Sequence, residues 1–390
     1  MDGPRGTAPS GRVSCRARRA AIAIAFQPAG RPGVTSLMSS THTGFKHLPI
    51  VDVSGLFSDD IDRRLATARE LDRAAREAGF FYVTGHQVSR GQQGALIEQA
   101  KRFFAAGHDW KMRYYIGNSS AHRGYVPEGE EVFAGGKRDR KEAFDTGREL
   151  PADDPDVIAG TPMLGSNSWP EQPGFREAVG GYYEASFELG RALFRGFSLA
   201  LGLPEQHFER YLRKPPSQLR LIHYPLDPSA EDRPGIGAHT DYECFTILLP
   251  TAPGLEVMNG RGEWIDAPPV GNAFVVNIGD MLEVWTGGTY VATSHRVRKV
   301  REERYSFPLF FACDYHTVVA PLPQFATPEA VAKYPPVSAG DHLYAQTAQS
   351  FTYLKARLER GELVLPDGSK ALASFGQQAR YASAEQDAEG

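Results

Sequence analysis

Apolar residues recur every three or four positions in several parts of the chain, which is the spacing of an amphipathic helix. The first series is Ile61, Leu65, Ala68, Leu71, Ala75 and Ala78. It predicts a helix that ends before Gly79, because glycine commonly follows a helix. Ser58, followed by the acids Asp59 and Asp60, is the expected N-cap. Similar series predict helices over residues 95–106, 174–201 and 342–358.

A different pattern predominates after residue 218, where short apolar or alternating runs are bounded by Gly, Pro and Asn. The runs are residues 219–224, 245–249, 255–258, 273–278, 293–300 and 305–312. Many short strands without intervening helices predict an all-β sandwich or jelly roll. Two more strands are expected at residues 48–53 and 80–85, which are rich in β-branched and aromatic residues. The expected fold is therefore mainly β, with helices packed outside it.

These patterns divide the chain into four segments. Residues 1–46 are rich in arginine and poor in acids, which indicates a disordered segment, a targeting leader, or a start placed upstream of Met38. Residues 47–214 form the expected helical and mixed domain, 215–325 the β domain, and 326–390 a C-terminal helix and tail. Glycine and proline are frequent at 117–175, which predicts long loops with short pieces of structure, often a lid or pocket wall.

Composition and charge limit the kinds of partner and the location that the protein is expected to have. The 390 residues carry a net charge of −4, which argues against a nucleic-acid partner or an acidic membrane surface. No run of 18 apolar residues occurs, so no membrane span is expected. The three cysteines include no CxxC pair, which favours a reducing, cytoplasmic location, with Cys244 and Cys313 as small buried residues. The oligomeric state, monomer or homodimer, stays open.

Two segments contain residues suited to a metal ion. In a strand, His239 and Asp241 would point to the same face, and His295, in the later run 293–300, is a candidate third ligand. Two histidines and one carboxylate on one side of an ion form the facial triad of non-haem iron oxygenases, which leaves positions open for substrate and O₂. A closed structural zinc site would instead need four protein ligands. His-x-Asp alone is weak evidence, since a single histidine is more often structural.

A second pair of residues points to an anion. Arg304 and Ser306 lie two apart, on one face of an expected strand that continues into the apolar run 307–311. A buried arginine needs a counter-ion, and a guanidinium beside a hydroxyl can bind a carboxylate. A dicarboxylate cosubstrate would supply this carboxylate.

Together these segments resemble the iron(II)/2-oxoglutarate-dependent oxygenases of the isopenicillin-N-synthase-like superfamily. The matching segments are His239-Thr-Asp241, His295-Arg-Val, Arg304-Tyr-Ser306, Leu48-Pro-Ile-Val-Asp-Val, Ala78-Gly-Phe-Phe-Tyr-Val-Thr-Gly-His86, and Asn277-Ile-Gly-Asp280 with Thr286-Gly-Gly288 as the hairpin before the second histidine. The resemblance covers roughly residues 48–325. It implies a distorted double-stranded β-helix, a relative of the jelly roll, wrapped by helices.

The resemblance also implies roles for individual residues. His239, Asp241 and His295 would be the catalytic metal ligands. Arg304 and Ser306 would hold the distal carboxylate of 2-oxoglutarate, and Tyr224 would also reach this cosubstrate. Asn277 would lie beside a metal ligand or beside the cosubstrate, without binding the metal itself. Plant members tend to have Asn two residues before the tyrosine, where this chain has Ile222.

The implied activity uses iron(II), 2-oxoglutarate and O₂. It would release succinate and CO₂ and hydroxylate, desaturate or cyclise a small organic substrate. Three alternatives stay open: an oxidase without 2-oxoglutarate, like isopenicillin N synthase; an oxygenase of nucleic acids or proteins, which the acidic balance disfavours; and a non-catalytic metal-binding jelly-roll protein.

Residues of the substrate pocket are the hardest to predict, since they come from loops. The candidates are Arg123, Tyr125, Glu128, Phe144, Tyr242, Thr246 and Phe310. Their mixture of charge and aromatic surface suits a small, partly polar metabolite such as an amino-acid derivative or a natural-product intermediate. Secondary metabolism, including antibiotic biosynthesis, is the corresponding expectation.

Overall fold

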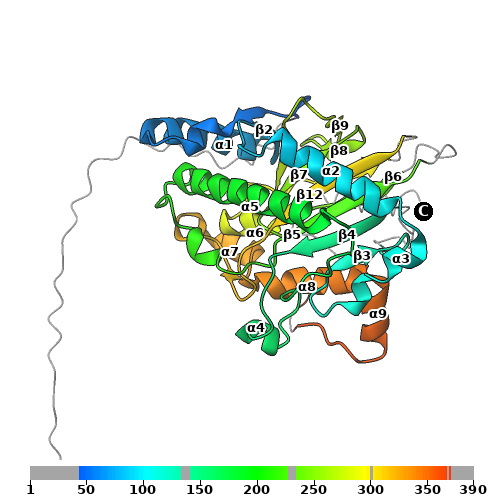
Figure 1. The fold of residues 1–390 in the computed structure, drawn as a ribbon. Coiled ribbons are helices and arrows are strands. Elements are labelled where there is room, and N and C mark those ends of the chain that lie inside the picture. Colours follow the sequence, from blue (N-terminus) through cyan, green and yellow to red (C-terminus); the bar gives the residue numbers. More distant parts are fainter. Residues whose placement is uncertain (1–43, 133–140, 227–233, 299–301, 367–368, 370–390) are drawn as a thin grey trace, which may run out of the picture. The chain divides into compact units, whose positions relative to one another are not determined.

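The structure, a computed structural model, describes residues 44–132, 141–226, 234–298, 302–366 and 369 (Figure 1). The expected leader, residues 1–46, therefore lies outside the described residues except for its last three. Residues 370–390 of the expected tail also lie outside them.

The strands form two main sheets. The strands are β1 (Ile50–Asp52), β2 (Phe80–Thr84), β3 (Gly124–Val126), β4 (Glu142–Gly147), β5 (Gln218–Tyr224), β6 (Pro234–His239), β7 (Phe245–Pro250), β8 (Leu255–Met258), β9 (Trp264–Asp266), β10 (Phe274–Ile278), β11 (His295–Arg298), β12 (Arg304–Phe311), β13 (Val318–Val319) and β14 (Val337–Ser338). The larger sheet has eight strands in the order β1-β2-β10-β7-β12-β5-β4-β3, and the smaller has four in the order β6-β11-β8-β9. Within the larger sheet, β1 and β2 are parallel and the other pairs are antiparallel.

The helices come mostly before and after the strands of the β region. They are α1 (Ile61–Glu77), α2 (Arg90–Phe104), α3 (His108–Met112), α4 (Pro155–Ile158), α5 (Phe175–Ala200), α6 (Asp280–Trp285), α7 (Pro328–Lys333), α8 (Ala339–Ser350) and α9 (Thr352–Glu359). Short 3-10 turns lie at Val53–Phe57, Ile116–Asn118, Glu209–Tyr211 and Pro323–Phe325. In the view of Figure 1, α2 and α5 lie in front of the strands and α8 lies below β4.

The larger sheet has two different faces because successive side chains of a strand point to opposite sides. The outer face packs against α1, α2 and α5 in one apolar core. Its strand residues include Phe81, Phe144, Leu219, Leu221, Phe245, Ile247, Phe274, Val276, Phe307, Leu309 and Phe311. The inner face meets the smaller sheet, where Tyr82 and Leu248 cluster with Leu255 and Val257 of β8. It also meets α8 and α9, where Ile222 clusters with Ala348 and Leu354.

Several predicted elements begin or end differently from the expectation. The N-cap of α1 is Asp60, whose carboxylate accepts from Asp62 N at 2.9 Å, whereas Ser58 Oγ accepts from Asp60 N. The expected helix over 342–358 is two helices, because Phe351 adopts an extended backbone between them. The expected loop region 117–175 contributes β3 and β4 to the larger sheet. The hairpin expected after Asn277 contains the helix α6.

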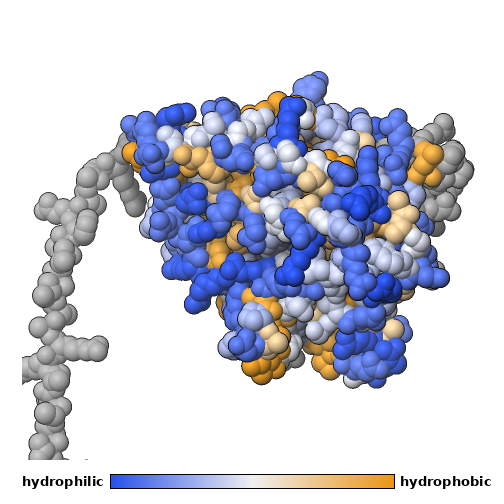
Figure 2. Space-filling view, in the orientation of Figure 1, coloured by the Kyte–Doolittle hydropathy of each residue, from blue (hydrophilic) through white to orange (hydrophobic). Residues whose placement is uncertain are grey.

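The face in view is mostly hydrophilic, with hydrophobic residues in small groups, one of them over α4 (Figure 2). No helix in the described part of the chain is both long and apolar enough to cross a membrane. Cys244 and Cys313 are buried and free, as the sequence predicted.

Candidate active site

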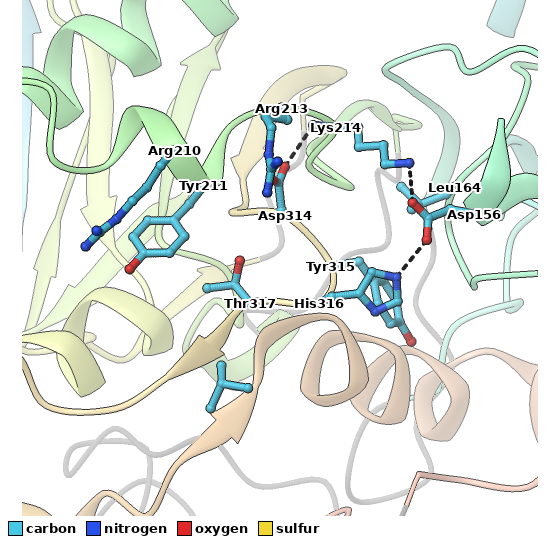
Figure 3. Close-up of a pocket in the computed structure, with 11 residues that line it drawn as sticks. Asp156, Leu164, Arg210, Tyr211, Arg213, Lys214, Asp314, Tyr315, His316 and Thr317 are labelled. Carbon is cyan, nitrogen blue, oxygen red and sulfur yellow. Dashed lines mark hydrogen bonds and ion pairs between the residues drawn. The ribbon is translucent and has the colours of Figure 1, made fainter. Parts of the chain in front are cut away.

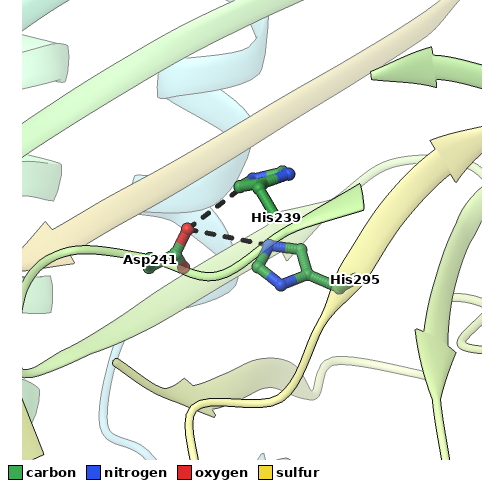
Figure 4. Close-up of side chains that lie close together, drawn as sticks. All are labelled: His239, Asp241 and His295. Atoms are coloured by element: carbon green, nitrogen blue, oxygen red, sulfur yellow. Dashed lines mark ion pairs between the residues drawn. The ribbon is translucent and has the colours of Figure 1, made fainter. Parts of the chain in front are cut away.

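Three side chains from the smaller sheet and the turn after it form a cluster that could hold a metal ion. Ligand atoms of His239, Asp241 and His295 all lie within 4.8 Å of one another (Figure 4). His239 is the last residue of β6 and pairs directly with His295, the first residue of β11. Asp241 Oδ1 lies 3.8 Å from His239 Nε2 and 3.6 Å from His295 Nε2. The three residues predicted from two separate segments therefore meet at one point.

Asp241 does not lie in a strand, as the sequence led us to expect, but in the turn after β6. Backbone hydrogen bonds to the segment before α6 hold this turn: Asp280 N donates to Asp241 O at 2.9 Å and Gly279 N donates to Cys244 O at 2.9 Å. A Cβ on Gly279 would lie 2.4 Å from Glu243 O, so only glycine permits this approach. In this turn Asp241 Oδ1 faces both histidines.

Backbone carbonyls orient both imidazoles. His239 Nδ1 lies 2.9 Å from Gly237 O, and His295 Nδ1 lies 3.2 Å from Thr293 O. A proton on Nδ1 makes each of these contacts a hydrogen bond, which directs Nε2 toward Asp241. This is the arrangement of histidines that bind a metal through Nε2.

The carboxylate of Asp241 is oriented through its second oxygen. Oδ2 accepts hydrogen bonds from Thr246 Oγ1 and, at 2.7 Å, from Asn277 Nδ2, which leaves Oδ1 facing the two histidines. Thr246 was expected in the substrate pocket, but its hydroxyl contacts the aspartate. Asn277, expected beside a metal ligand or beside the cosubstrate, also contacts the aspartate. Their shared partner could not be found from the sequence, since β7 and β10 meet only in the folded sheet.

The protonation states of His239 and Asp241 also suit the binding of a metal ion. Burial and the charge of His295 lower the pKa of His239 to about 4. Burial would raise the pKa of Asp241, but His295 and His239 outweigh it and lower this pKa. At neutral pH His239 is therefore neutral and Asp241 ionised, the forms that bind a divalent cation. The donor set fits iron(II) in a facial site.

Arg304 forms the second part of the site. It is the first residue of β12, is fully buried, and pairs with Tyr224 of β5, whose ring lies 4.8 Å from the guanidinium carbon. Its Nε makes a long contact, 3.4 Å, to Ala252 O, whereas Nη1 and Nη2 have no partner among the described residues. Ser306 lies two residues on, so both side chains belong to the inner face. A buried guanidinium without an anion is costly, so this geometry fits a bound carboxylate.

The structure separates the candidate substrate residues into two groups. Tyr125 and Phe144 lie in the outer core, where Phe144 contacts Phe103 and Tyr125 donates to Glu142 at 2.7 Å. They are not brought together with the metal cluster, because their positions in β3 and β4 place them on the outer face. Phe310 is on the inner face and half-buried in an otherwise buried strand, so it borders interior space.

Two other candidates lie near the inner side. Tyr242 follows Asp241 directly and its ring lies 6.0 Å from the ring of His342 on α8. Arg123 is buried, with its guanidinium donating to the carbonyls of His122 and Met163 at 3.3 and 3.2 Å. Glu128, also considered from the sequence, has no contact that places it near the cluster in the described part of the chain.

Sequence reasoning missed a buried ion network on the inner face. Arg220 of β5 donates to both oxygens of Asp145 on β4 at 2.8 Å and also pairs with Glu131. Glu131 Oε2 lies 2.7 Å from Lys141 Nζ. Burial would raise the pKa of Glu131, but Arg220 and Lys141 lower it to about 2. The alternation of charged and apolar residues at 218–224 was a signal for Arg220, whereas nothing in the sequence pairs it with Glu131.

A separate pocket of about 540 Å³ shares no lining residue with the metal cluster (Figure 3). Most of its charged side chains are in ion pairs. Lys214 Nζ contacts Asp156 and lies 2.9 Å from Asp154, which does not line the pocket; His316 contacts Asp156 at 2.7 Å, and Arg213 lies 3.6 Å from Asp314. These internal pairs leave little unbalanced charge for a ligand, so the metal cluster is the better candidate for chemistry.

Comparison with known proteins places this geometry in a family. Residues 48–172 match the model described as non-haem dioxygenase in morphine synthesis N-terminal, and residues 215–312 match the 2OG-Fe(II) oxygenase superfamily. The chain is 33% identical over 314 residues to the 2-oxoglutarate-Fe(II) type oxidoreductase hxnY of Emericella nidulans, covering 78% of this chain and 90% of the relative. It is 35% identical over 325 residues to the homoarginine-6-hydroxylase 2-ODD-233 of Oryza sativa, covering 79% and 98%.

Solved structures agree. A 2OG-Fe(II) oxygenase family protein from Caulobacter crescentus superposes with a TM-score of 0.68 at 29% identity, covering 81% of this chain and 99% of the other. Neurospora crassa T7H in complex with alpha-KG superposes with a TM-score of 0.66 at 25% identity, covering 83% and 99%. With its His-Asp-His cluster and buried arginine, the chain belongs to the 2-oxoglutarate/iron(II)-dependent oxygenase family.

Proposed function

We propose that His239, Asp241 and His295 hold the iron of this 2-oxoglutarate-dependent dioxygenase, and that Arg304, with Ser306 and Tyr224, holds the distal carboxylate of the cosubstrate. The single observation that supports the cosubstrate site best is Arg304, fully buried with both terminal nitrogens unpaired among the described residues. A buried cation of this kind needs an anion, and a carboxylate matches its fork of donors.

The two facing sheets support a finer description of the fold. In this proposal residues 215–325 form a distorted double-stranded β-helix. Residues 47–214 form the mixed N-terminal domain and 326–390 the C-terminal helices and tail. In this proposal the metal is bound at the smaller sheet, where His239 pairs with His295, whereas Arg304 lies on the inner face of the larger sheet. The reaction then takes place between the sheets.

The enzyme couples oxidation of a small substrate to conversion of 2-oxoglutarate and O₂ into succinate and CO₂; in a hydroxylation, one oxygen atom enters succinate and the other the product. When bound, iron(II) supplies this redox chemistry. The chain's own residues orient the reactants. Gly237 O and Thr293 O direct the imidazoles, and Thr246 with Asn277 directs the carboxylate. The apolar walls around Phe80, whose ring contacts His295 at 5.1 Å, exclude water from one side.

The prime substrate is proposed to be a small, partly polar metabolite. One relative is named for homoarginine hydroxylation, and T7H has been solved with thymine, so both related proteins take small polar compounds. In this chain, Phe310 and Tyr242 are only half-buried while their neighbours are buried, which supports a pocket at this place.

The proposal is tested by adding 2-oxoglutarate to anaerobic protein loaded with iron(II) and recording the visible charge-transfer band of the chelate. Arg304→Gln should weaken apparent 2-oxoglutarate binding roughly 30-fold or more, because a buried charge partner is lost. The exposed Arg113→Gln is the matched control and should bind like wild type.

Iron binding without the band, or O₂ consumption without succinate, would contradict the cosubstrate site and favour an oxidase that does not use 2-oxoglutarate. No iron binding at all would contradict the proposed ligands.

A further inference from the structure

Arg304 is not the only inner side chain whose polar atoms lack partners. Gln346 of α8 is fully buried, and neither Nε2 nor Oε1 has a hydrogen-bond partner among the described residues. Gln218 of β5 is 5% exposed, and its Nε2 is likewise unpaired there. In the described part of the chain, Arg304 and Gln346 are the only side chains with two such atoms. Buried polar groups are nearly always paired, so each exception needs an explanation.

Gln346 lies on the side of α8 that connects the metal-binding turn with the ion network. One helical turn before it, His342 Nε2 lies 3.3 Å from Asp280 Oδ2, and Asp280 accepts from Thr240 of the metal-binding turn at 2.9 Å. One turn after it, Ser350 O accepts from Val132 N at 2.9 Å. Residues four apart share a helix face, so Gln346 faces the interior between these two contacts.

Gln218 approaches the same interior from the larger sheet. It pairs with Phe310 of β12, and Phe310 pairs in turn with Thr246, whose hydroxyl contacts Asp241. These residues share the inner face, so Gln218 lies two strands, about 10 Å, from the residue that orients the iron-binding carboxylate. On its other side Gln218 pairs with Gly147, against which the guanidinium of Arg123 lies.

Apart from Arg123, whose guanidinium donates to the carbonyls of His122 and Met163, the charges in this region are paired with one another. Arg220 is paired with Asp145 and Glu131, and Lys141 with Glu131, so two cations balance two anions. A fully charged substrate group here would have to break a buried pair, which is costly. Gln346 and Gln218 present unpaired carboxamide atoms, and carboxamides complement a neutral group that both donates and accepts hydrogen bonds.

We propose that Gln346 and Gln218 determine substrate specificity, and that the prime substrate carries an amide, lactam or imide group which binds these two carboxamides while its reactive C–H bond faces the iron. The inference rests on the proposed function, because it uses the same iron and cosubstrate sites. Neither glutamine is a metal or 2-oxoglutarate ligand in this assignment.

The first test needs no substrate. If Gln346 binds a ligand, its unpaired amide destabilises the ligand-free protein, because a buried polar group without a hydrogen bond costs free energy. The near-isosteric Gln346→Met should therefore raise the melting temperature by about 2 °C or more. Gln93→Met is the matched control: Gln93 is also buried, but its Nε2 donates to Val88 O at 3.2 Å, so this variant should melt lower. A lower melting temperature for Gln346→Met would show that the glutamine has a structural partner and would overturn the proposal.

The second test measures succinate release with defined probes: thymine, uracil, glutarimide and 2-piperidone, each beside its N-methylated counterpart. At least one N–H compound should raise succinate release in wild type, and its methylated counterpart should not. The stimulation should fall by about tenfold or more in Gln346→Met and in Gln218→Met, because a buried hydrogen-bonding site discriminates strongly against a missing partner. The 2-oxoglutarate chelate band should stay unchanged in both variants.

Three results would overturn the proposal: no stimulation by any N–H probe, stimulation that persists in both variants, or stimulation only by charged compounds such as homoarginine or simple carboxylic acids. A failure of the proposed function is distinguishable, because wild type itself would then lack the chelate band and substrate-independent succinate release.

Discussion

The two faces of the larger sheet are made by the same strands but differ in chemistry. On β12, Tyr305, Phe307, Leu309 and Phe311 point to the helices, whereas Arg304, Ser306 and Phe310 point inward. The outer face is an aromatic and aliphatic core in which Phe245 stacks on Phe311 with ring centroids 4.8 Å apart. The inner face holds a buried arginine with unpaired nitrogens, an ion network and the hydroxyl that contacts Asp241.

The difference shows how stability and activity are divided within one sheet. Apolar surface on the outer face is buried against helices, which stabilises the fold. Polar groups on the inner face are left unpaired at a cost, which is typical of sites that wait for a ligand. Substitutions on the outer face should therefore act on unfolding, and substitutions of the ligand-binding groups on the inner face should act on binding and turnover.

The largest effect is expected at the metal cluster. Asp241→Ala should reduce iron content and succinate release to background, since it removes one of three ligands. The control is Asp266→Ala, which changes an exposed carboxylate of the smaller sheet. Metal analysis and succinate assays check both; retained turnover in Asp241→Ala would remove this residue from the site.

The next effect tests the outer face. Phe144→Ala should lower the free energy of unfolding by about 3–5 kcal/mol, because it opens a cavity against Phe103 and Phe175. The folded fraction should still form the 2-oxoglutarate chelate. The comparison variant is Phe310→Ala, on the inner face of β12. It should lower the free energy of unfolding less, and it should reduce substrate-stimulated turnover. Denaturant unfolding and titration of the 2-oxoglutarate chelate are measured for both variants. Loss of the chelate in folded Phe144→Ala would contradict the assignment of stability to the outer face and binding to the inner face.

A buried charge on the inner face provides a pH test. Glu131→Gln should lower the free energy of unfolding by roughly 2 kcal/mol or more at pH 7, because Arg220 and Lys141 lose their shared partner. The folded pKa of about 2 lies below the ordinary value of 4.5, so the stabilisation is fully present above pH 4.5 and is lost as the pH falls toward 2. Unfolding of wild type and variant at pH 7, 5, 4 and 3 should show a difference that shrinks only below pH 4.5. A difference that disappears between pH 7 and 5 would contradict the ionised pair.

The smallest effect concerns the partners of the metal ligand. Asn277→Ala should lower iron affinity or turnover about 10–100-fold, because Asp241 keeps only the hydroxyl of Thr246 to orient it. Titration with iron(II) measures this loss, with the exposed Asn118→Ala as the control. Unchanged affinity would mean that the turn and the hydroxyl of Thr246 orient the carboxylate without Asn277.

Much of this arrangement could be predicted because it depends on local pattern. The short apolar runs after residue 218 correspond to β5, β7, β8, β10, β11 and β12. The residues of the cluster were found from their types and spacing, since histidine, aspartate and arginine are uncommon in apolar strands. The turn geometry of Asp241 was not found, because it depends on Gly279 and Asp280 from a distant segment.

Local sequence thus specified the strands, the helices and the residue types that can bind iron and a dicarboxylate, because periodicity and side-chain chemistry are properties of neighbouring residues. Only the folded chain decided which face each strand presents to the helices, that Phe144 and Tyr125 belong to the core, and that Thr246 contacts Asp241. The pairing of Arg220 with Glu131 and the unpaired state of Gln346 were also decided there. Such contacts join residues far apart in sequence, and they follow from strand order, register and helix packing, which no local pattern contains.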